Sequence, residues 1–163
     1  MMLIGHVAKE EGPFWSAHAD LIGAFTHGES KGEAFEVLAE LIESMVERPG
    51  FKVTITDHPG GGSGAVLIEA NEPALLTAQV LKHQRELHGL SLSQVAARLG
   101  ASSRNAYARY EQGASLPSID RLNELLGVVA PNVALVFAER KPAKPAKPSA
   151  TNVGAKKRKP TAR

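Results

Sequence analysis

The chain has 163 residues, 43% of them hydrophobic, and contains no cysteine. This length suits one ordinary domain or two small ones, and the lack of cysteine excludes disulfides and thiolate metal sites. The apolar stretches are too short to span a membrane and the first residues do not resemble a signal peptide, so we expect a cytoplasmic protein without membrane contact.

The formal net charge of +2 conceals three unlike segments. Residues 1–72 carry four basic and twelve acidic side chains, a net charge of −8, whereas residues 73–139 carry +1. Residues 140–163 carry nine basic side chains and no acidic one. We therefore predict an N-terminal domain at 1–71, a second domain at 72–139, and a basic Lys/Pro-rich tail that is disordered because it has too few apolar residues to build a core.

The N-terminal segment has the alternation of short strands. Strands are predicted at 3–8, 14–19 and 23–26, separated by Glu11-Gly12-Pro13 and by the residues around Leu21. Three short strands with tight connections favour an antiparallel meander.

An amphipathic helix is predicted next. Ser30 and Glu33 have the spacing of a capping box, and Pro49-Gly50 ends the helical pattern. Apolar and acidic side chains occupy different positions along it: Phe35, Leu38, Leu41, Ile42, Met45 and Val46 against Glu33, Glu36, Glu40, Glu43 and Glu47. Strands at 51–56 and 65–69 follow, so the sequence predicts an α+β fold with an antiparallel sheet and one helix.

From Pro73 onward the pattern is helical. Helices are predicted near 73–88, 91–98, 103–112 and 118–127. The apolar segment from Pro131 to Phe137 is compatible with a short strand or a helix, and a strand there would be able to pair with its copy in a dimer.

The stretch from Leu81 to Leu126 resembles the Cro/repressor-type helix-turn-helix. The matching elements are Arg85 four residues before Gly89, Gly89-Leu90-Ser91 at the start of the second helix, Gln94, Ala96, Leu99-Gly100, Glu111, Gly113 and Pro117. The segment 101–111 is one residue longer than the commonest pattern, which leaves the register of the third helix open by one position. The resemblance also implies an ion pair between Arg85 and Glu111 that joins the first helix to the third.

In that family the third helix enters the major groove and the second lies across the DNA backbone. Carried onto this sequence, the resemblance implies base contacts at the start of the third helix and phosphate contacts at the start of the second. The DNA-binding candidates are Ser93, Gln94, Ser102, Ser103, Arg104, Asn105 and Arg109. For Tyr107, Arg109 and Tyr110 a second interpretation stays open, with Tyr110 in the core and Arg109 a solvated surface charge.

The segment Glu11 to Ala34 resembles the N-terminal domain of HicB-type antitoxins, which is similar to a reduced ribonuclease H fold. The motifs that carry the resemblance are Gly12, Phe14-Trp15, Asp20-Leu21-Ile22-Gly23, Thr26-His27-Gly28 and Glu33-Ala34. Such antitoxins cover a HicA-type toxin, an mRNA-cleaving ribonuclease, and repress their shared operon as dimers or larger assemblies. The residues expected to contact the toxin are Trp15, Asp20, Glu36, Glu40 and Glu43.

Charge alone supports this function only in part. An acidic domain would compete with RNA for a basic ribonuclease surface, but an acidic helix face also simply keeps a protein soluble. An alternative is a stand-alone transcription regulator whose N-terminal domain senses a small molecule or dimerises. For the basic tail, nonspecific DNA contact is the leading interpretation, beside a solubility role and partner binding.

An enzyme is the third alternative. Metal-dependent nuclease chemistry needs several converging carboxylates, and the predicted strands offer only Asp20 with Asp57 or Glu69. The four N-terminal histidines lack the spacing of a metal site: His6, His18, His27 and His58. The sequence therefore predicts no catalytic residue, no metal and no cofactor, and names operator DNA, a ribonuclease toxin and a second copy of the chain as partners.

Overall fold

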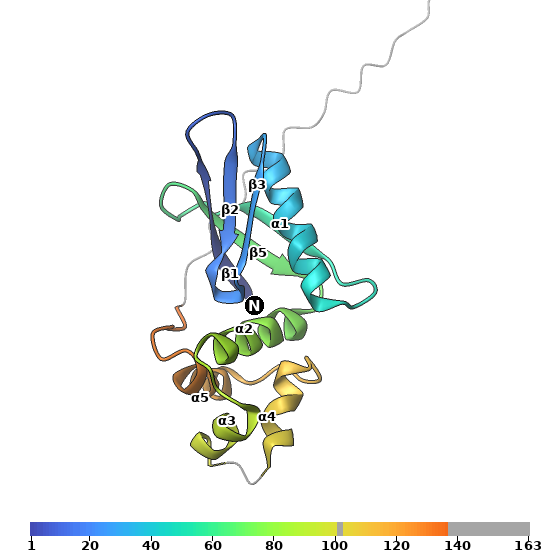
Figure 1. The fold of residues 1–163 in the computed structure, drawn as a ribbon, viewed down its shortest axis with the longest axis vertical. Helices are drawn as coiled ribbons and strands as arrows, with labels where there is room; N and C mark the ends of the chain where they lie inside the picture. The colour runs from blue at the N-terminus through green and yellow to red at the C-terminus, as the bar shows by residue number, and fades with distance from the viewer. Residues whose placement is uncertain (101–102, 137–163) are drawn as a thin grey trace, which may run out of the picture.

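The computed structural model describes residues 1–100 and 103–136 and has two parts, a sheet with one helix and a group of four helices (Figure 1). The elements of the first part are β1 (Met2–Lys9), β2 (Trp15–Ala19), the short 3-10 helix η1 (Asp20–Ile22), β3 (Ala24–Gly28), α1 (Lys31–Val46), β4 (Val53–Asp57) and β5 (Ala65–Ala70). Those of the second are α2 (Pro73–Leu87), α3 (Leu92–Arg98), α4 (Arg104–Glu111) and α5 (Ile119–Val129). The predicted α+β class is confirmed.

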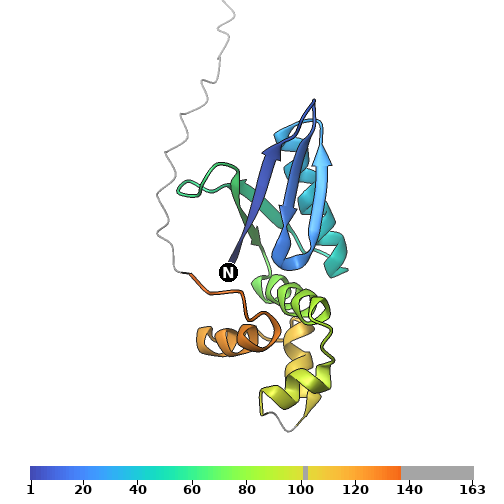
Figure 2. The same cartoon turned by 60° about the vertical axis from the view of Figure 1, so that its left-hand side comes forward.

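The sheet has five antiparallel strands in the order β3-β2-β1-β5-β4. The first three form the predicted meander, and β5 pairs along the free side of β1. Because β3 and β4 are the two edges, α1 carries the chain across one face of the sheet from edge to edge (Figure 2). The other face has no helix of the described residues on it.

Helix α1 begins at the predicted cap. The Oγ of Ser30 accepts a hydrogen bond from the Glu33 N–H at 3.1 Å, while the Glu33 carboxylate accepts one from the Glu29 N–H instead of completing a capping box with Ser30. The helix ends at Val46, before the predicted Pro49-Gly50, because Glu47 already adopts a left-handed conformation with φ of 51°.

The buried face of α1 fills the inner side of the sheet. Ala34, Leu38 and Ile42 are fully buried there. The predicted apolar face is therefore confirmed at its centre. Four further apolar members of that face are only partly buried: Phe35, Leu41, Met45 and Val46.

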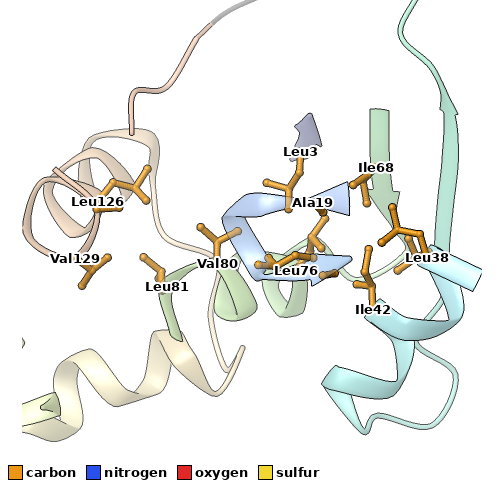
Figure 3. Close-up of a cluster of buried hydrophobic side chains, with 14 of the residues drawn as sticks. Leu3, Ala19, Leu38, Ile42, Ile68, Leu76, Val80, Leu81, Leu126 and Val129 are labelled. Atoms are coloured by element: carbon orange, nitrogen blue, oxygen red, sulfur yellow. The ribbon is translucent and has the colours of Figure 1, made fainter. Parts of the chain in front are cut away.

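Helix α2 belongs to both parts of the molecule. Its Leu76 and Val80 pack in the same hydrophobic cluster as Leu3 of the sheet, whereas Leu81 faces Leu126 of α5 (Figure 3). One continuous core thus runs from the sheet into the helices, and α2 is the layer between them.

A close approach also joins η1 to α2. Gly23, which ends η1, has φ of 67°, and a Cβ atom added there would lie 2.3 Å from Cε1 of His83. On the same side of α2, Nε2 of the buried Gln84 donates a hydrogen bond to the Leu21 carbonyl at 3.2 Å. A glycine is required here both for its left-handed conformation and for the missing side chain.

The four predicted helices of the second part are confirmed within two residues at each end. The segment after them differs from the expectation, since α5 continues to Val129 and the described residues 131–136 form neither a strand nor a helix. Pairing of this segment with a second copy of the chain stays a prediction. Phe137 and the basic tail lie outside the described residues.

Candidate nucleic-acid interface

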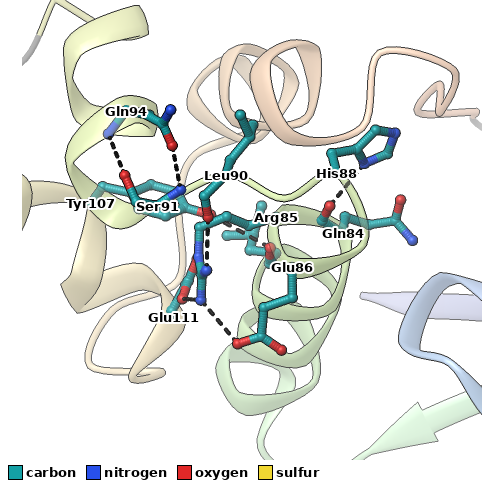
Figure 4. A network of polar contacts seen from close by, with 10 residues as sticks. Gln84, Arg85, Glu86, His88, Leu90, Ser91, Gln94, Tyr107 and Glu111 are labelled. Atoms are coloured by element: carbon teal, nitrogen blue, oxygen red, sulfur yellow. Dashed lines mark hydrogen bonds and ion pairs between the residues drawn. The ribbon is translucent and has the colours of Figure 1, made fainter.

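The start of α3 is set by a complete capping box. The Oγ of Ser91 accepts a hydrogen bond from the Gln94 N–H at 3.2 Å, and Oε1 of Gln94 accepts one from the Ser91 N–H at 2.8 Å (Figure 4). Ser93 and Gln94, both predicted phosphate contacts, are exposed in this first turn. With Oε1 of Gln94 engaged in the cap, its Nε2 amide is the group placed to donate to a phosphate.

Helix α4 exposes its first turn to solvent. Ser103 is the N-cap, and its Oγ accepts a hydrogen bond from the Asn105 N–H at 3.2 Å. The hydroxyl of Ser103 therefore caps the helix, and its contact with a base stays a prediction. Arg104, Asn105 and Arg109 are all exposed. The remaining predicted base contact, Ser102, lies outside the described residues.

Two of these side chains share one face of α4. Asn105 and Arg109 are four residues apart, so they lie on the same face of the helix, about one turn from each other. Tyr107, on the opposite side of the helix, is completely buried. An amide and a guanidinium on a common exposed face are the groups that form paired hydrogen bonds with adenine and guanine edges. The solvated-charge interpretation of Arg109 is compatible with its exposure, but its position beside Asn105 fits a DNA contact.

The predicted ion pair between α2 and α4 is present. Nε of Arg85 lies 2.6 Å from Oε1 of Glu111 and Nη2 lies 2.9 Å from Oε2, a paired contact (Figure 4). Nη1 donates to the Leu90 carbonyl at 3.0 Å. The two side chains are only 13% and 8% exposed. Hydrogen bonding to the Glu111 carboxylate raises the pKa of the Arg85 guanidinium above its usual value.

The aromatic core residue of α4 is Tyr107, not Tyr110. Tyr107 is completely buried, with its hydroxyl facing the Leu81 carbonyl at 3.5 Å. Burial, and then its hydrogen bond to Glu111, raises the pKa of this phenol. Tyr110 is only partly buried and lies beside the Arg121 guanidinium at 5.9 Å from its ring centre. The interpretation that put Tyr110 in the core is met only in part, because its ring packs against the core from a partly buried position while Tyr107 fills the interior.

A family model described as Helix-turn-helix matches residues 81–128. Residues 81–128 form a helix-turn-helix domain. The match runs from the middle of α2 into α5 and so contains the capped starts of α3 and α4 and the Arg85–Glu111 pair. The comparison with curated proteins gave no match. The helix-turn-helix match supports a DNA-binding transcription regulator, with α4 as the candidate recognition helix.

The predicted toxin contacts, in contrast, are not gathered at one place. Trp15 is the first residue of β2 and Asp20 is the first residue of η1, which follows β2, so the two lie about 16 Å apart along the chain. Trp15 is partly buried against the core, while Asp20 is exposed and bound to Nδ1 of His18 at 2.8 Å. Glu36 and Glu40 are exposed on the outer side of α1.

Glu43 differs from the other acids of α1. Its carboxylate is 18% exposed and accepts hydrogen bonds from Nζ of Lys52 at 2.6 Å and from the Val53 N–H at 2.9 Å. These contacts lower the pKa of Glu43 below its usual value, with the Lys52 hydrogen bond the largest cause. Glu43 therefore ties α1 to the start of β4, and its role as a toxin contact stays a prediction.

A further exposed surface, without a signal in the sequence pattern, is the face of the sheet away from α1. Phe25 is 57% exposed there and lies in a row of rings. The His6 and His18 rings are 5.6 Å apart, Phe25 is 6.4 Å from His18, and His27 stacks edge-on against Phe25 at 4.6 Å. Strand alternation predicts that side chains two residues apart, such as Phe25 and His27, share a face of the sheet. The rings of different strands become neighbours only through the strand register, which pairs His18 with His6 and with Phe25.

Within residues 1–100 and 103–136, no three His, Asp or Glu side chains are grouped so as to hold a metal ion. Nor do the described helices include one with the length and apolar character needed to cross a membrane.

Proposed function

We propose that this DNA-binding regulator is an antitoxin that represses its own operon and neutralises a small basic ribonuclease of the HicA type. The observation that carries the proposal is a sheet domain beside the helix-turn-helix domain, with surface that the helices leave exposed. The sheet domain extends away from the recognition helix α4 and keeps one sheet face and the outer side of α1 exposed (Figure 1). The resemblance of Glu11 to Ala34 to HicB-type antitoxins supports the same function.

Electrostatics supports the choice of partner. An mRNA-cleaving ribonuclease binds phosphates and must present a basic surface, while residues 1–72 carry a net charge of −8. Opposite net charges raise the association rate at low salt, because long-range attraction steers the two surfaces together. The exposed carboxylates of Glu36 and Glu40 contribute to this field whether or not they lie in the contact itself.

Repression requires more than one copy of the helix-turn-helix domain. Two recognition helices reach successive major grooves only when a dimer holds them about 34 Å apart. Exposed apolar side chains on the helical part support self-association: Leu116, Ile119, Leu135 and Val136. We propose a dimer or tetramer as the DNA-bound form.

The experiment is co-expression of the full chain with the product of the adjacent gene. We expect the neighbour alone to arrest growth, and this chain to rescue growth and to co-purify with it. The matched variant Asn105→Ala/Arg109→Ala should lose operator binding and still rescue, which separates the two activities. A harmless or non-binding neighbour would overturn the antitoxin part and leave the DNA-binding regulator standing.

The electrostatic part has its own measurement. We expect the association rate of the chain with the purified toxin to fall steeply with ionic strength, and to fall at low salt in the variant Glu36→Gln/Glu40→Gln. A rate that does not depend on salt would remove steering from the mechanism without removing the complex.

One observation favours a second candidate, a regulator that senses a small molecule. A hollow of 230 Å³ lies where α1 meets α2, lined by Met45, Gln79, Lys82, His83 and Glu86. A ligand there would bridge the sheet domain and the first helix of the DNA-binding domain. A metabolite that changes operator affinity in the absence of any protein partner would favour this function.

A further inference from the structure

The end of the sheet farthest from α2 contains a hollow that the proposed function does not yet use. It has a volume of 400 Å³ and is lined by Glu10, Phe14 and His27. Glu10 and Phe14 belong to the loop between β1 and β2, which stands at the end of the sheet opposite α2 (Figures 1 and 2). His27 comes from the neighbouring strand β3 on the face that α1 does not cover.

Short-range contacts hold the Glu10 and His27 side chains and the loop that carries Phe14 in place. The Glu10 N–H donates to the Phe14 carbonyl at 3.0 Å, which closes the loop and sets these two residues side by side. The hydroxyl of Ser16, a residue only 4% exposed, donates a hydrogen bond to the Glu10 carboxylate. The edge-on contact with Phe25 fixes the ring of His27. The carboxylate is therefore oriented by a buried group and does not sample solvent at random.

Both chemical groups of the hollow, the Phe14 ring and the Glu10 carboxylate, are accessible to a ligand. Phe14 is 48% exposed, so an aromatic surface lies uncovered beside the carboxylate. Among the ion pairs of the described residues, none uses Glu10. A carboxylate next to an exposed ring combines a bidentate acceptor with a π-face.

We propose that this hollow receives the guanidinium group of an arginine side chain presented by a basic protein partner. A planar guanidinium stacks on the Phe14 ring while its N–H groups donate to the Glu10 carboxylate, with the His27 ring as the third wall of the hollow. An ammonium group is a point charge that cannot stack in this way, so lysine binds less well. Nucleic acid is disfavoured because its phosphates would meet Glu10 within a domain of net charge −8.

The position of the hollow defines the partner's footprint. A partner anchored there covers the exposed rings of Phe25 and His27 next to it, since these lie on the same sheet face. It does not reach the outer side of α1, which lies beyond the opposite face of the sheet (Figure 2). The choice of a basic ribonuclease as the partner rests on the proposed function. The hollow places the contact with this partner at the β1–β2 end of the sheet and not at the acidic residues of α1.

The first experiment needs no partner. We would titrate the full chain with N-acetyl-arginine N-methylamide and follow the backbone amide resonances, using the neutral citrulline analogue as a probe of the same shape. We expect saturating shifts at Glu10, Phe14, Ser16 and His27 with the arginine compound alone. Glu10→Gln should abolish them and Glu11→Gln, the matched change at the exposed neighbour, should keep them. Equal shifts with citrulline, shifts unaffected by Glu10→Gln, or shifts confined to α1 would overturn the proposal.

The second experiment separates this inference from the proposed function. With the ribonuclease bound to the full chain, Glu10→Gln should raise Kd about tenfold or more, the effect typical of losing a charged anchor, and Glu11→Gln less than about twofold. Binding that is equal in the two variants would overturn the anchor and leave the antitoxin function intact. If the wild-type chain binds no ribonuclease, the proposed function fails, and the arginine titration alone decides what the hollow binds.

Discussion

The Arg85–Glu111 pair links the first and third helices of the DNA-binding domain, and its removal is the most informative perturbation of this fold. Arg85→Ala deletes both hydrogen bonds to Glu111 and the one to the Leu90 carbonyl. The Glu111 carboxylate, only 8% exposed, is then left without its cationic partner. We expect a loss of stability and, through it, of DNA binding.

The magnitude follows from burial. Breaking a buried pair by removing one partner costs roughly 3–5 kcal/mol, and the 13% exposure of Arg85 lets some water reach the site, so we expect about 3 kcal/mol. For a chain of this size that lowers Tm by about 6–12 °C. Glu111→Ala should cost less, because Arg85 keeps Glu86 at 3.1 Å and the Leu90 carbonyl.

Thermal unfolding followed by circular dichroism measures the stability, and fluorescence anisotropy with operator DNA well below Tm measures the affinity. Arg109→Ala, which removes an exposed arginine on α4, is the matched control: Tm should hold while operator affinity falls. If Arg85→Ala lost DNA affinity at unchanged Tm, Arg85 would be a DNA contact and the structural assignment would be wrong.

Four further changes test other parts of the molecule. Asn105→Ala should weaken operator binding by about tenfold or more and relax base preference at one position, at unchanged Tm, as measured by anisotropy with operator variants. Glu43→Gln should lower the free energy of unfolding in urea at pH 7 by about 1 kcal/mol. Because the pKa of Glu43 is lowered in the folded protein, its carboxylate stabilises the fold above the usual carboxyl pKa, and this stabilisation is lost as pH falls through the folded pKa. The difference in stability between the variant and the wild type must therefore shrink in acid. Gly23→Ala should lower Tm, because alanine is strained at φ of 67° and its Cβ displaces His83, and adding His83→Ala should restore part of the loss. Deleting residues 141–163 should flatten the dependence of log K on log salt while keeping operator preference; an unchanged slope would exclude DNA contact by the tail.

Local signals predicted most of the secondary structure. Ser30, Ser91 and Ser103 are N-caps whose hydroxyls bind backbone N–H groups within the first turn of the helix that follows. The Arg85–Glu111 pair was also predictable, because the helix-turn-helix resemblance supplies the long-range geometry that a single sequence lacks. Periodicity at three and four residues is a property of the helix alone, so it is visible without knowing what the helix packs against.

Features that depend on distant segments outside the helix-turn-helix resemblance could not be predicted. Glu43 repeats the spacing of Glu36 and Glu40, and only the position of Lys52 and β4 turns its carboxylate inward. The row of rings on the uncovered sheet face depends on strand register, which sequence alternation leaves undetermined between neighbours. The hollow at Glu10 needs the loop closed and the β3 edge in place, and it therefore had no signal in the sequence.

Helix α2 determines how the DNA-binding domain and the proposed partner-binding domain are related. It supplies the first helix of the DNA-binding domain through Arg85, and its other side is buried against the sheet through Leu76 and the Gln84 hydrogen bond to the Leu21 carbonyl. A helix buried on both sides is not a flexible linker, so the sheet domain is held at a fixed angle to α4. The β1–β2 loop lies at the far end of that domain (Figure 1). A partner anchored there therefore extends away from the DNA, and its binding is sterically compatible with an occupied operator; any effect of the partner on repression must then arise from contacts between assembled copies.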